Sequence, residues 1–125
     1  MTTEELREIL SNPKGKIFAF DLDKTLCVEG CWGEKEMLNA TPVKGMFELI
    51  DWIACNGGVI LIFTARPSRF YSVTFAWLYY NNIYFHGICM QYKPHAHIYV
   101  DDLAFNVNDI SKSFFLKVKK ERRKQ

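Results

Sequence analysis

The sequence predicts an α/β domain in which helices pack on a mainly parallel sheet. Short apolar runs that are typical of buried strands alternate with segments of helical periodicity, and the connections between them are short. Hydrophobic residues make up 49% of the chain, which indicates a folded core rather than a disordered chain. No linker, repeat or low-complexity stretch interrupts the sequence, so we expect residues 1–125 to form a single domain.

The first third of the chain predicts a helix followed by a strand. Thr2 and Glu5 have the spacing of a capping box, and the helix that it begins is expected to run through Leu10. A turn rich in helix breakers then leads into the apolar run 16–20, which suits a buried strand. Residues 27–39 show no clean period, and we expect a loop or a small flap there.

The middle of the chain predicts a second helix and the clearest strand. Thr41 and Pro42 look like an N-cap and a first helical position, and apolar residues follow at helical spacing until a Gly-Gly pair ends the helix. The run 59–63 is apolar throughout, which is typical of a parallel strand that is buried on both faces.

The next segment predicts one more helix and three short strands. Ser68 or Ser72 can cap the helix, and strands are expected at 83–85, 88–90 and 97–100. The helix and its C-terminal end are rich in aromatic residues, which we interpret as core with a rim of partly exposed tyrosines rather than as a base-stacking surface. These residues are Phe75, Trp77, Tyr79, Tyr80 and Tyr84.

Polar residues follow three of the predicted strands at the points where the strands end. Asp21 and Asp23 follow the first strand, Thr64 follows the second, and Asp101 and Asp102 follow the last. The carboxyl ends of parallel strands share one edge of a sheet, and ligands gather at that edge. The sequence therefore predicts a site there.

The residue types at this edge suit a phosphate ester and a divalent cation. Asp21 and Asp23 project to the same side of an extended strand end, where they repel each other unless a cation lies between them or one keeps a proton. Carboxylate oxygens suit Mg²⁺, which shares the rest of its shell with substrate phosphate. Arg66 and Lys93 carry charges that match phosphate oxygens, although each could equally be a surface cation.

Together these residues resemble the four motifs of the haloacid dehalogenase superfamily. Asp21-x-Asp23-x-Thr25, Thr64, Lys93 and Asp101-Asp102 occur in the family's order and span most of the chain. The sequence around the motifs is similar to small members without a cap domain, among them capsule-biosynthesis and sugar-phosphate phosphatases. The resemblance implies a three-layer, Rossmann-like domain without a cap.

Two positions depart from the usual family pattern. Lys24 stands where glycine is commoner, although lysine occurs there in the family, and Tyr92 precedes Lys93 where close relatives tend to have glycine. The second departure means that a substrate preference cannot be carried over.

The resemblance implies a Mg²⁺-dependent phosphomonoesterase that works through an aspartyl-phosphate. Asp21 would be the nucleophile, and Asp23 would be the general acid and base whose backbone carbonyl also binds the metal. Thr64 and Lys93 would bind phosphoryl oxygens, and Arg66 would be a further phosphate or substrate clamp.

The resemblance also implies a third metal carboxylate. Asp102 is our choice, with Asp101 orienting Lys93, but the sequence leaves the reverse assignment open. His95 and His97 are expected beside the site, either as satisfied strand-end residues or in contact with a leaving group.

The gaps between the motifs have no room for a folded cap, which usually needs about 50 residues. An open site is therefore expected, to which a second copy of the chain could add a wall. The favoured substrate is a small phosphorylated metabolite such as a sugar phosphate, and a polynucleotide 3′-phosphatase is the alternative enzyme. A phospho-receiver signalling domain is disfavoured, because receivers place the adjacent acidic pair after the first strand and the single phosphorylated aspartate later.

The net charge of +2 is unevenly distributed. Residues 117–125 carry six basic residues and one acid, which leaves −3 for residues 1–116. We interpret this basic tail as a solvated, frayed end rather than as a nucleic-acid-binding arm. The segment 111–119 is expected to be an edge strand or a final helix.

The sequence also predicts a cytoplasmic protein without a membrane partner. No apolar run approaches the roughly 20 residues of a membrane span, and the N-terminus lacks the profile of a secretory signal. In that compartment the cysteines stay reduced, and we expect Cys55 and Cys89 to be small buried residues. A zinc site is disfavoured because its candidate ligands match no common spacing: Cys27, Cys31, Cys89, His95 and His97.

Overall fold

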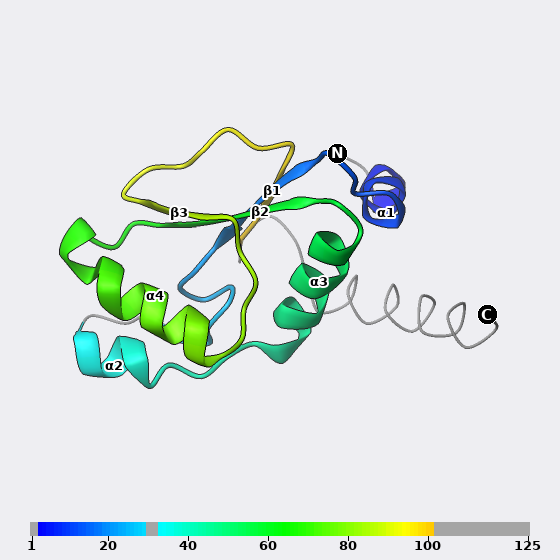
Figure 1. Cartoon of the computed structure of the whole chain (residues 1–125). Helices are drawn as coiled ribbons and strands as arrows, with labels where there is room; N and C mark the ends of the chain where they lie inside the picture. Colours follow the sequence, from blue (N-terminus) through cyan, green and yellow to red (C-terminus); the bar gives the residue numbers. More distant parts are fainter. Residues whose placement is uncertain (1–2, 30–32, 102–125) are drawn as a thin grey trace.

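Four parallel strands form the centre of the computed structural model, which describes residues 3–29 and 33–101 (Figure 1). The sheet has the order β3-β2-β1-β4, so the chain builds outward from β1 and then crosses back to place β4 on the other side of β1. The strands are β1 (Ile17–Asp21), β2 (Val59–Thr64), β3 (Gly87–Met90) and β4 (Ile98–Val100). This confirms the predicted α/β class, and the described residues contain no cap domain.

Helices lie in two of the three crossover connections between the parallel strands, and the loop 91–97 forms the third. The helices are α1 (Thr3–Ser11), α2 (Glu34–Leu38), α3 (Lys44–Cys55), the 3₁₀ turn η1 (Ser68–Phe70) and α4 (Tyr71–Tyr80). The α3 helix connects β1 to β2, and η1 with α4 connects β2 to β3. Figure 1 shows α2, α3 and α4 on one side of the sheet and the loop 91–97 on the other.

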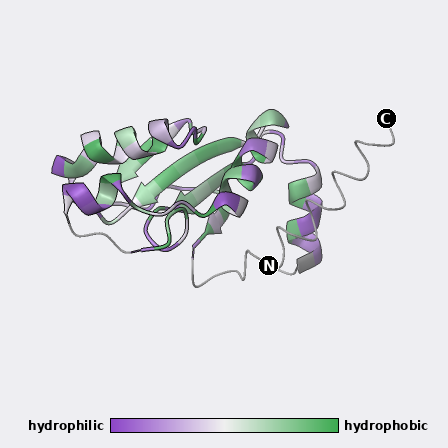
Figure 2. Cartoon of the chain, turned by 90° about the horizontal axis from the view of Figure 1, so that it is seen from below, coloured by the Kyte–Doolittle hydropathy of each residue, from purple (hydrophilic) through white to green (hydrophobic). Residues whose placement is uncertain are grey.

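The core lies between the sheet and the helices α3 and α4. The strand side chains on that face are fully or almost fully buried, and Figure 2 shows the strands as the hydrophobic centre of the molecule. They form one cluster with apolar residues of both helices: Phe18, Phe20, Ile60, Ile62, Ile98 and Val100 from the strands, and Met46, Leu49, Ile50, Ile53, Trp77 and Leu78 from the helices. Burial of this apolar area is the main stabilising contribution.

Strand β2 is less buried than the sequence predicted. Its residues alternate between buried and half-buried, with Ile60 and Ile62 in the core and Leu61 and Phe63 half-buried on the opposite face. Among the described residues that face is covered in part by the loop 91–97, whose Lys93 ammonium lies 5.8 Å from the centre of the Phe63 ring. The expected burial on both faces is therefore only partly met.

Helix α3 begins later than the Thr41-Pro42 pattern predicted, because a tertiary contact takes the capping groups. The Thr41 N–H and hydroxyl both donate to the Glu29 carboxylate, at 3.0 and 2.8 Å. Pro42 forms an isolated bridge with Cys27, and Val43 becomes the N-cap residue. The helix ends at Cys55, directly before the Gly57-Gly58 region that was predicted to end it. Gly58 is required there because it approaches Ile53 too closely to allow a Cβ atom.

Two further sequence predictions were wrong. Residues 34–38 form the short helix α2, which buries Met37, within the segment expected to be a loop or a small flap without regular structure. Residues 83–85 are not a strand, and Ile83 instead belongs to the C-terminal cap of α4. Asn82 has a left-handed φ of 55°, and the Ile83 N–H donates to the Leu78 carbonyl at 3.0 Å, as in a Schellman motif.

The predictions for the cysteines are met in part, and several other predictions concern residues outside the described ranges. Cys89 is buried as predicted, but Cys55 is exposed at the end of α3. The predictions for Cys31, for the segment 111–119 and for the tail 117–125 lie outside the described residues. Within residues 3–29 and 33–101, no helix has the length and apolar character needed to cross a bilayer.

Replacing Trp77 with phenylalanine should destabilise the fold by about 2 kcal/mol. Its indole is 2% exposed, packs edge-on against Phe47, and donates from Nε1 to the Ala40 carbonyl at 3.0 Å. The substitution leaves both a small void and a buried carbonyl without its donor. Trp52→Phe is the matched control, because Trp52 makes the same type of bond to Leu10 from a half-buried position and should lose about 1 kcal/mol or less. Urea denaturation of the three proteins measures both values, and equal losses would contradict this account.

Candidate active site

The carboxyl ends of three neighbouring strands carry the predicted polar residues. Asp21 is the last residue of β1, Thr64 is the last residue of β2, and Asp101 directly follows β4. The register makes these ends level, since Asp21 pairs with Phe63 on one side and the preceding residue, Phe20, pairs with Val100 on the other. The strand order reverses at β1, which is where open α/β sheets form their binding crevices. Asp102 lies outside the described residues.

Asp21 is half-buried at this edge. Its Oδ1 accepts a hydrogen bond from the Leu22 N–H at 2.9 Å, which fixes one carboxylate oxygen against the start of the turn. The turn that follows is wound around the Leu22 carbonyl, which accepts from the N–H groups of Thr25, Leu26 and Cys27 at 3.3, 2.9 and 3.2 Å.

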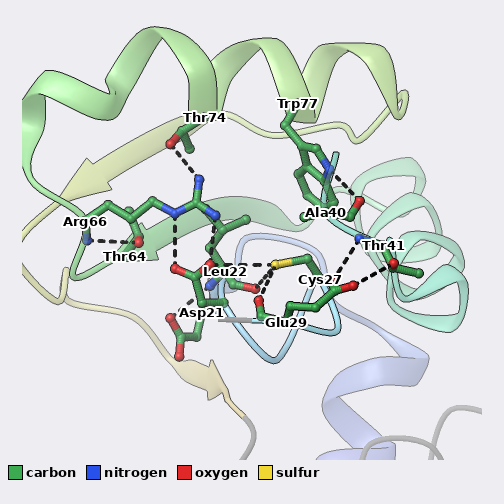
Figure 3. Close-up of polar contacts among 11 residues, drawn as sticks. Asp21, Leu22, Cys27, Glu29, Ala40, Thr41, Thr64, Arg66, Thr74 and Trp77 are labelled. Carbon is green, nitrogen blue, oxygen red and sulfur yellow. Dashed lines mark hydrogen bonds and ion pairs between the residues drawn. The ribbon is translucent and has the colours of Figure 1, made fainter. Parts of the chain in front are cut away.

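Asp23 lies in this turn and is held by the buried side chain of Arg66. Arg66 Nε donates to Asp23 Oδ2 at 3.1 Å, and Nη2 donates to Oδ1 at 2.8 Å. The third guanidinium nitrogen, Nη1, donates to the Thr74 hydroxyl at 3.0 Å in α4 (Figure 3). Arg66 is only 5% exposed, so its charge is directed at Asp23 and not at solvent.

Thr64 is also buried, at 2% exposure, and it supports the same arginine. Its Oγ1 accepts a hydrogen bond from the Arg66 backbone N–H at 3.2 Å (Figure 3). The hydroxyl proton of Thr64 is not used in that bond, so the group can still donate to another oxygen.

Lys93 is exposed, and its position is set by an aromatic side chain of β4. Its ammonium lies 4.2 Å from the centre of the Tyr99 ring. The Tyr99 hydroxyl donates to the Pro94 carbonyl at 2.8 Å and accepts from the Ala96 N–H at 3.1 Å. Tyr99 therefore holds the residues that directly follow Lys93, and its ring contacts the lysine itself.

Lys24 adopts a backbone conformation that favours glycine. It has a φ of 68°, in the left-handed region that costs about 1 kcal/mol or more for a residue with a Cβ atom. The strained backbone of Lys24 directly follows Asp23, the candidate acid and base, and lies in the same turn. The Thr25 hydroxyl is buried in the same turn and makes no hydrogen bond to the described part of the chain.

A second loop contact holds the segment after the turn in place. Cys27 is fully buried, and its Sγ lies 3.2 Å from the Glu29 carbonyl and 3.7 Å from Asp23 Oδ1. Glu29 accepts the two hydrogen bonds from Thr41, of which the side-chain bond is the larger cause of a lowered pKa for Glu29. The stretch 27–29 is thereby tied to the residues that precede α3 (Figure 3).

His97 does not lie beside the site. The ring Nδ1 of His97 accepts a hydrogen bond from the Ile17 N–H at 2.8 Å, and the backbone N–H of His97 donates to the Ile17 carbonyl at 2.9 Å. Because Ile17 is the first residue of β1, these bonds place His97 at the opposite edge of the sheet from Asp21. His86 makes the same pair of bonds with Ile60 of β2, at 2.9 and 2.8 Å. His97 is thus a satisfied strand-end residue, which is the alternative that the sequence favoured, but its expected position beside the site was wrong.

Sequence reasoning did not identify Thr74, Tyr99 or Glu29 as parts of this site. Thr74 occupies an ordinary helix position, and Tyr99 reads as a strand residue. No sequence signal separated them from structural residues, because their role depends on which segments the fold brings together.

The donor chemistry of this edge fits Mg²⁺. Asp21 and Asp101 provide carboxylate oxygens, and Mg²⁺ is usually bound by only one or two protein carboxylates together with water and phosphate oxygens. In the ranges 3–29 and 33–101, no three His, Cys, Asp or Glu side chains form a group that could hold a metal ion by themselves.

Comparison with known proteins gives similarity in fold alone. No protein-family model and no curated protein sequence matches the chain. A structural-genomics target from Vibrio cholerae has a similar structure, with a TM-score of 0.57 and 22% identity over 85% of this chain and 98% of that one.

Two structures of a Pnkp1/Rnl/Hen1 complex, one of them titled as an RNA repair complex, also contain a similar fold. They have TM-scores of 0.54 and 0.55 and identities of 15% and 18%, each over 82% of this chain. The match spans only 32% and 34% of those two chains. At these identities the likeness supports the α/β fold and gives no activity.

Replacing Thr25 with valine should stabilise the protein by about 1 kcal/mol, because it removes a buried hydroxyl without a partner while keeping the side-chain shape. Thr74→Val is the matched control, since the Thr74 hydroxyl accepts from Arg66 and its loss should destabilise. Thermal unfolding of both variants measures the difference. A destabilised Thr25→Val protein would mean that the hydroxyl has a structural partner.

Proposed function

We propose that this chain is a phosphomonoesterase of the haloacid dehalogenase type, which uses Mg²⁺ and forms an aspartyl-phosphate on Asp21. The observation that carries the proposal is the convergence of Asp21, Thr64 and Asp101 at one edge of a parallel sheet, with Asp23 in the adjoining turn. The solved structures of similar fold support the scaffold, and the residues at its edge support the chemistry.

The proposed reaction has two displacements at phosphorus. The Asp21 carboxylate attacks phosphorus, the phosphorus–ester oxygen bond breaks, and Asp23 gives its proton to the leaving oxygen. A water molecule then attacks the phosphorus of the aspartyl-phosphate, Asp23 takes up a proton from that water, and inorganic phosphate leaves as Asp21 is restored. Mg²⁺, held by Asp21, the Asp23 carbonyl and Asp101 or Asp102, would neutralise charge on the phosphoryl oxygens.

The contacts of Asp23 support a fixed position for its carboxylate, which is one requirement of an acid and base. A proton-transfer group must be oriented toward the reacting oxygen, and Arg66 fixes the plane of the Asp23 carboxylate through two hydrogen bonds. Each carboxylate oxygen keeps acceptor capacity beyond the bond to Arg66. All three nitrogens of the guanidinium face Asp23 or Thr74, so we now propose Arg66 as a positioning residue instead of a phosphate clamp.

Thr64 and Lys93 are the proposed ligands of the phosphoryl oxygens. Thr64 keeps a hydroxyl proton to donate, and Lys93 provides a point charge on a segment ordered by Tyr99. We propose a small phosphorylated metabolite, such as a sugar phosphate, as the substrate, because residues 1–116 carry a net charge of −3 that would repel a polynucleotide.

Asp21→Asn should lower turnover by at least about 10³-fold on the best substrate of a panel of sugar phosphates, nucleotides and a 3′-phosphorylated oligonucleotide. The amide keeps the side-chain shape but is a far weaker nucleophile. Chelation of Mg²⁺ with EDTA should have a similar effect, and added Mg²⁺ should restore the rate. Phosphate release measures both.

Asp51→Asn is the control for this experiment, since Asp51 is an exposed carboxylate on α3 and should leave turnover unchanged. Wild-type rates from Asp21→Asn would overturn the mechanism. Preference for the oligonucleotide, with a rate that falls steeply as salt is raised, would instead favour the polynucleotide 3′-phosphatase.

Arg66→Lys should lower kcat by about 10²-fold with little change in KM, because lysine cannot hold both oxygens of Asp23 in one plane. A phosphate clamp would show the opposite pattern, with KM rising most. Arg69→Lys is the control, as Arg69 is exposed and lies over the Phe70 ring. Steady-state kinetics on folded protein, checked by circular dichroism, separates the two roles.

A further inference from the structure

The outward side of α4 carries a continuous set of exposed aromatic rings that the proposed chemistry does not use. Tyr71, Phe75 and Tyr79 are spaced four residues apart and stack in sequence, with ring centres 6.4 and 6.3 Å apart. Phe85, a half-buried ring in the loop after α4, contacts Phe75 edge-on at 5.9 Å, and the exposed Tyr80 contacts Tyr79 in the same way at 6.0 Å. We call these five residues the aromatic face.

The exposure of this face is unusual for a helix on the surface of a monomer. Tyr71, Phe75, Tyr79 and Tyr80 are 47%, 42%, 68% and 73% exposed. The opposite side of α4 is already buried in the core through Thr74, Trp77 and Leu78. The helix is therefore apolar or aromatic on both sides, and helices that are hydrophobic all round are normally covered.

The absence of charged side chains on α4 indicates what kind of partner would cover its aromatic face. Residues 71–80 include no acidic or basic side chain. Two copies of such a face can meet without desolvating a charge and without repulsion between like charges. A single-stranded nucleic acid would need cations beside the rings to hold its phosphates, and Arg69, just before the helix, instead packs on the Phe70 ring at 4.5 Å.

The size of the face suits the centre of a dimer interface. Aromatic residues bury about 150–250 Å² each, so rings that are about half exposed offer roughly 500 Å² together. A stable interface buries about 800 Å² on each partner, with aromatic residues concentrated at its centre. Rings repeated every four residues along one helix are also self-complementary when a second copy of the helix runs antiparallel about a twofold axis.

We propose that two copies of this chain form a homodimer through their aromatic faces, with α4 of one copy packed against α4 of the other. The contact lies on the same helix whose buried side holds Arg66 through Thr74. The proposal is independent of the proposed reaction, since it rests on the exposed rings and on the absence of charge along α4.

Sedimentation velocity between about 1 and 100 µM, a span that covers typical homodimer affinities, tests this interface. The wild type should approach twice the 14.6 kDa of one chain as its concentration rises. Phe75→Glu and Tyr79→Glu each place a charge in the centre of the face, and each should weaken dimerisation by at least about tenfold. Tyr92→Glu is the matched control, because Tyr92 is 62% exposed but lies outside the aromatic face, and its dimer should match the wild type.

Two outcomes would overturn the proposal. The first is a wild type that stays monomeric over the whole concentration range, and the second is a dimer that persists in Phe75→Glu and Tyr79→Glu. In the first case, binding of a fluorescent single-stranded oligonucleotide that is lost in Tyr79→Glu would assign the face to nucleic acid. Tyr79 is the most exposed ring of the stacked row, so its variant keeps the test valid even when Phe75→Glu fails to fold.

Discussion

The buried contact between Arg66 and Asp23 joins the segments on which the candidate site depends. Asp23 belongs to the turn after β1, Arg66 to the loop after β2, and Thr74 to α4, and one guanidinium connects all three. A side chain with five donors in a rigid plane is suited to this task, because it satisfies two acceptors in fixed directions. Strand pairing makes the strand ends level, and this contact sets how the loops beyond them are arranged.

Such an arrangement has an energetic cost that the rest of the fold must offset. Taking a guanidinium out of water is unfavourable even when a carboxylate accepts it, and the left-handed Lys24 adds strain in the same turn. The offsetting contribution comes from the apolar cluster beneath the sheet, where the β1 and β2 side chains that precede the site are fully buried. The rigidity of those strands holds a turn that would be unfavourable in isolation.

The sequence predicted the parts of this structure that depend on local pattern and failed where a distant residue intervenes. Strands 17–21, 59–64 and 98–100 follow from apolar runs, and their order along the chain was enough to place Asp21, Thr64 and Asp101 at one edge. Thr41 has every local feature of an N-cap, yet Glu29 takes its donors. His97 was expected beside the site, but its bonds to Ile17 put it at the amino end of β4, away from Asp101.

Helix α4 agrees with the predicted core and rim of partly exposed tyrosines except at Phe75, which is 42% exposed. A helix on one side of a sheet can bury only the side that faces the core. Trp77 and Thr74 lie on that side, where they serve the core and the contact with Arg66, while Phe75 and Tyr79 lie on the other. The absence of charge along α4 leaves its outer side suited to a second copy of itself. The fold within one chain thus accounts for one half of α4, and association between chains accounts for the other.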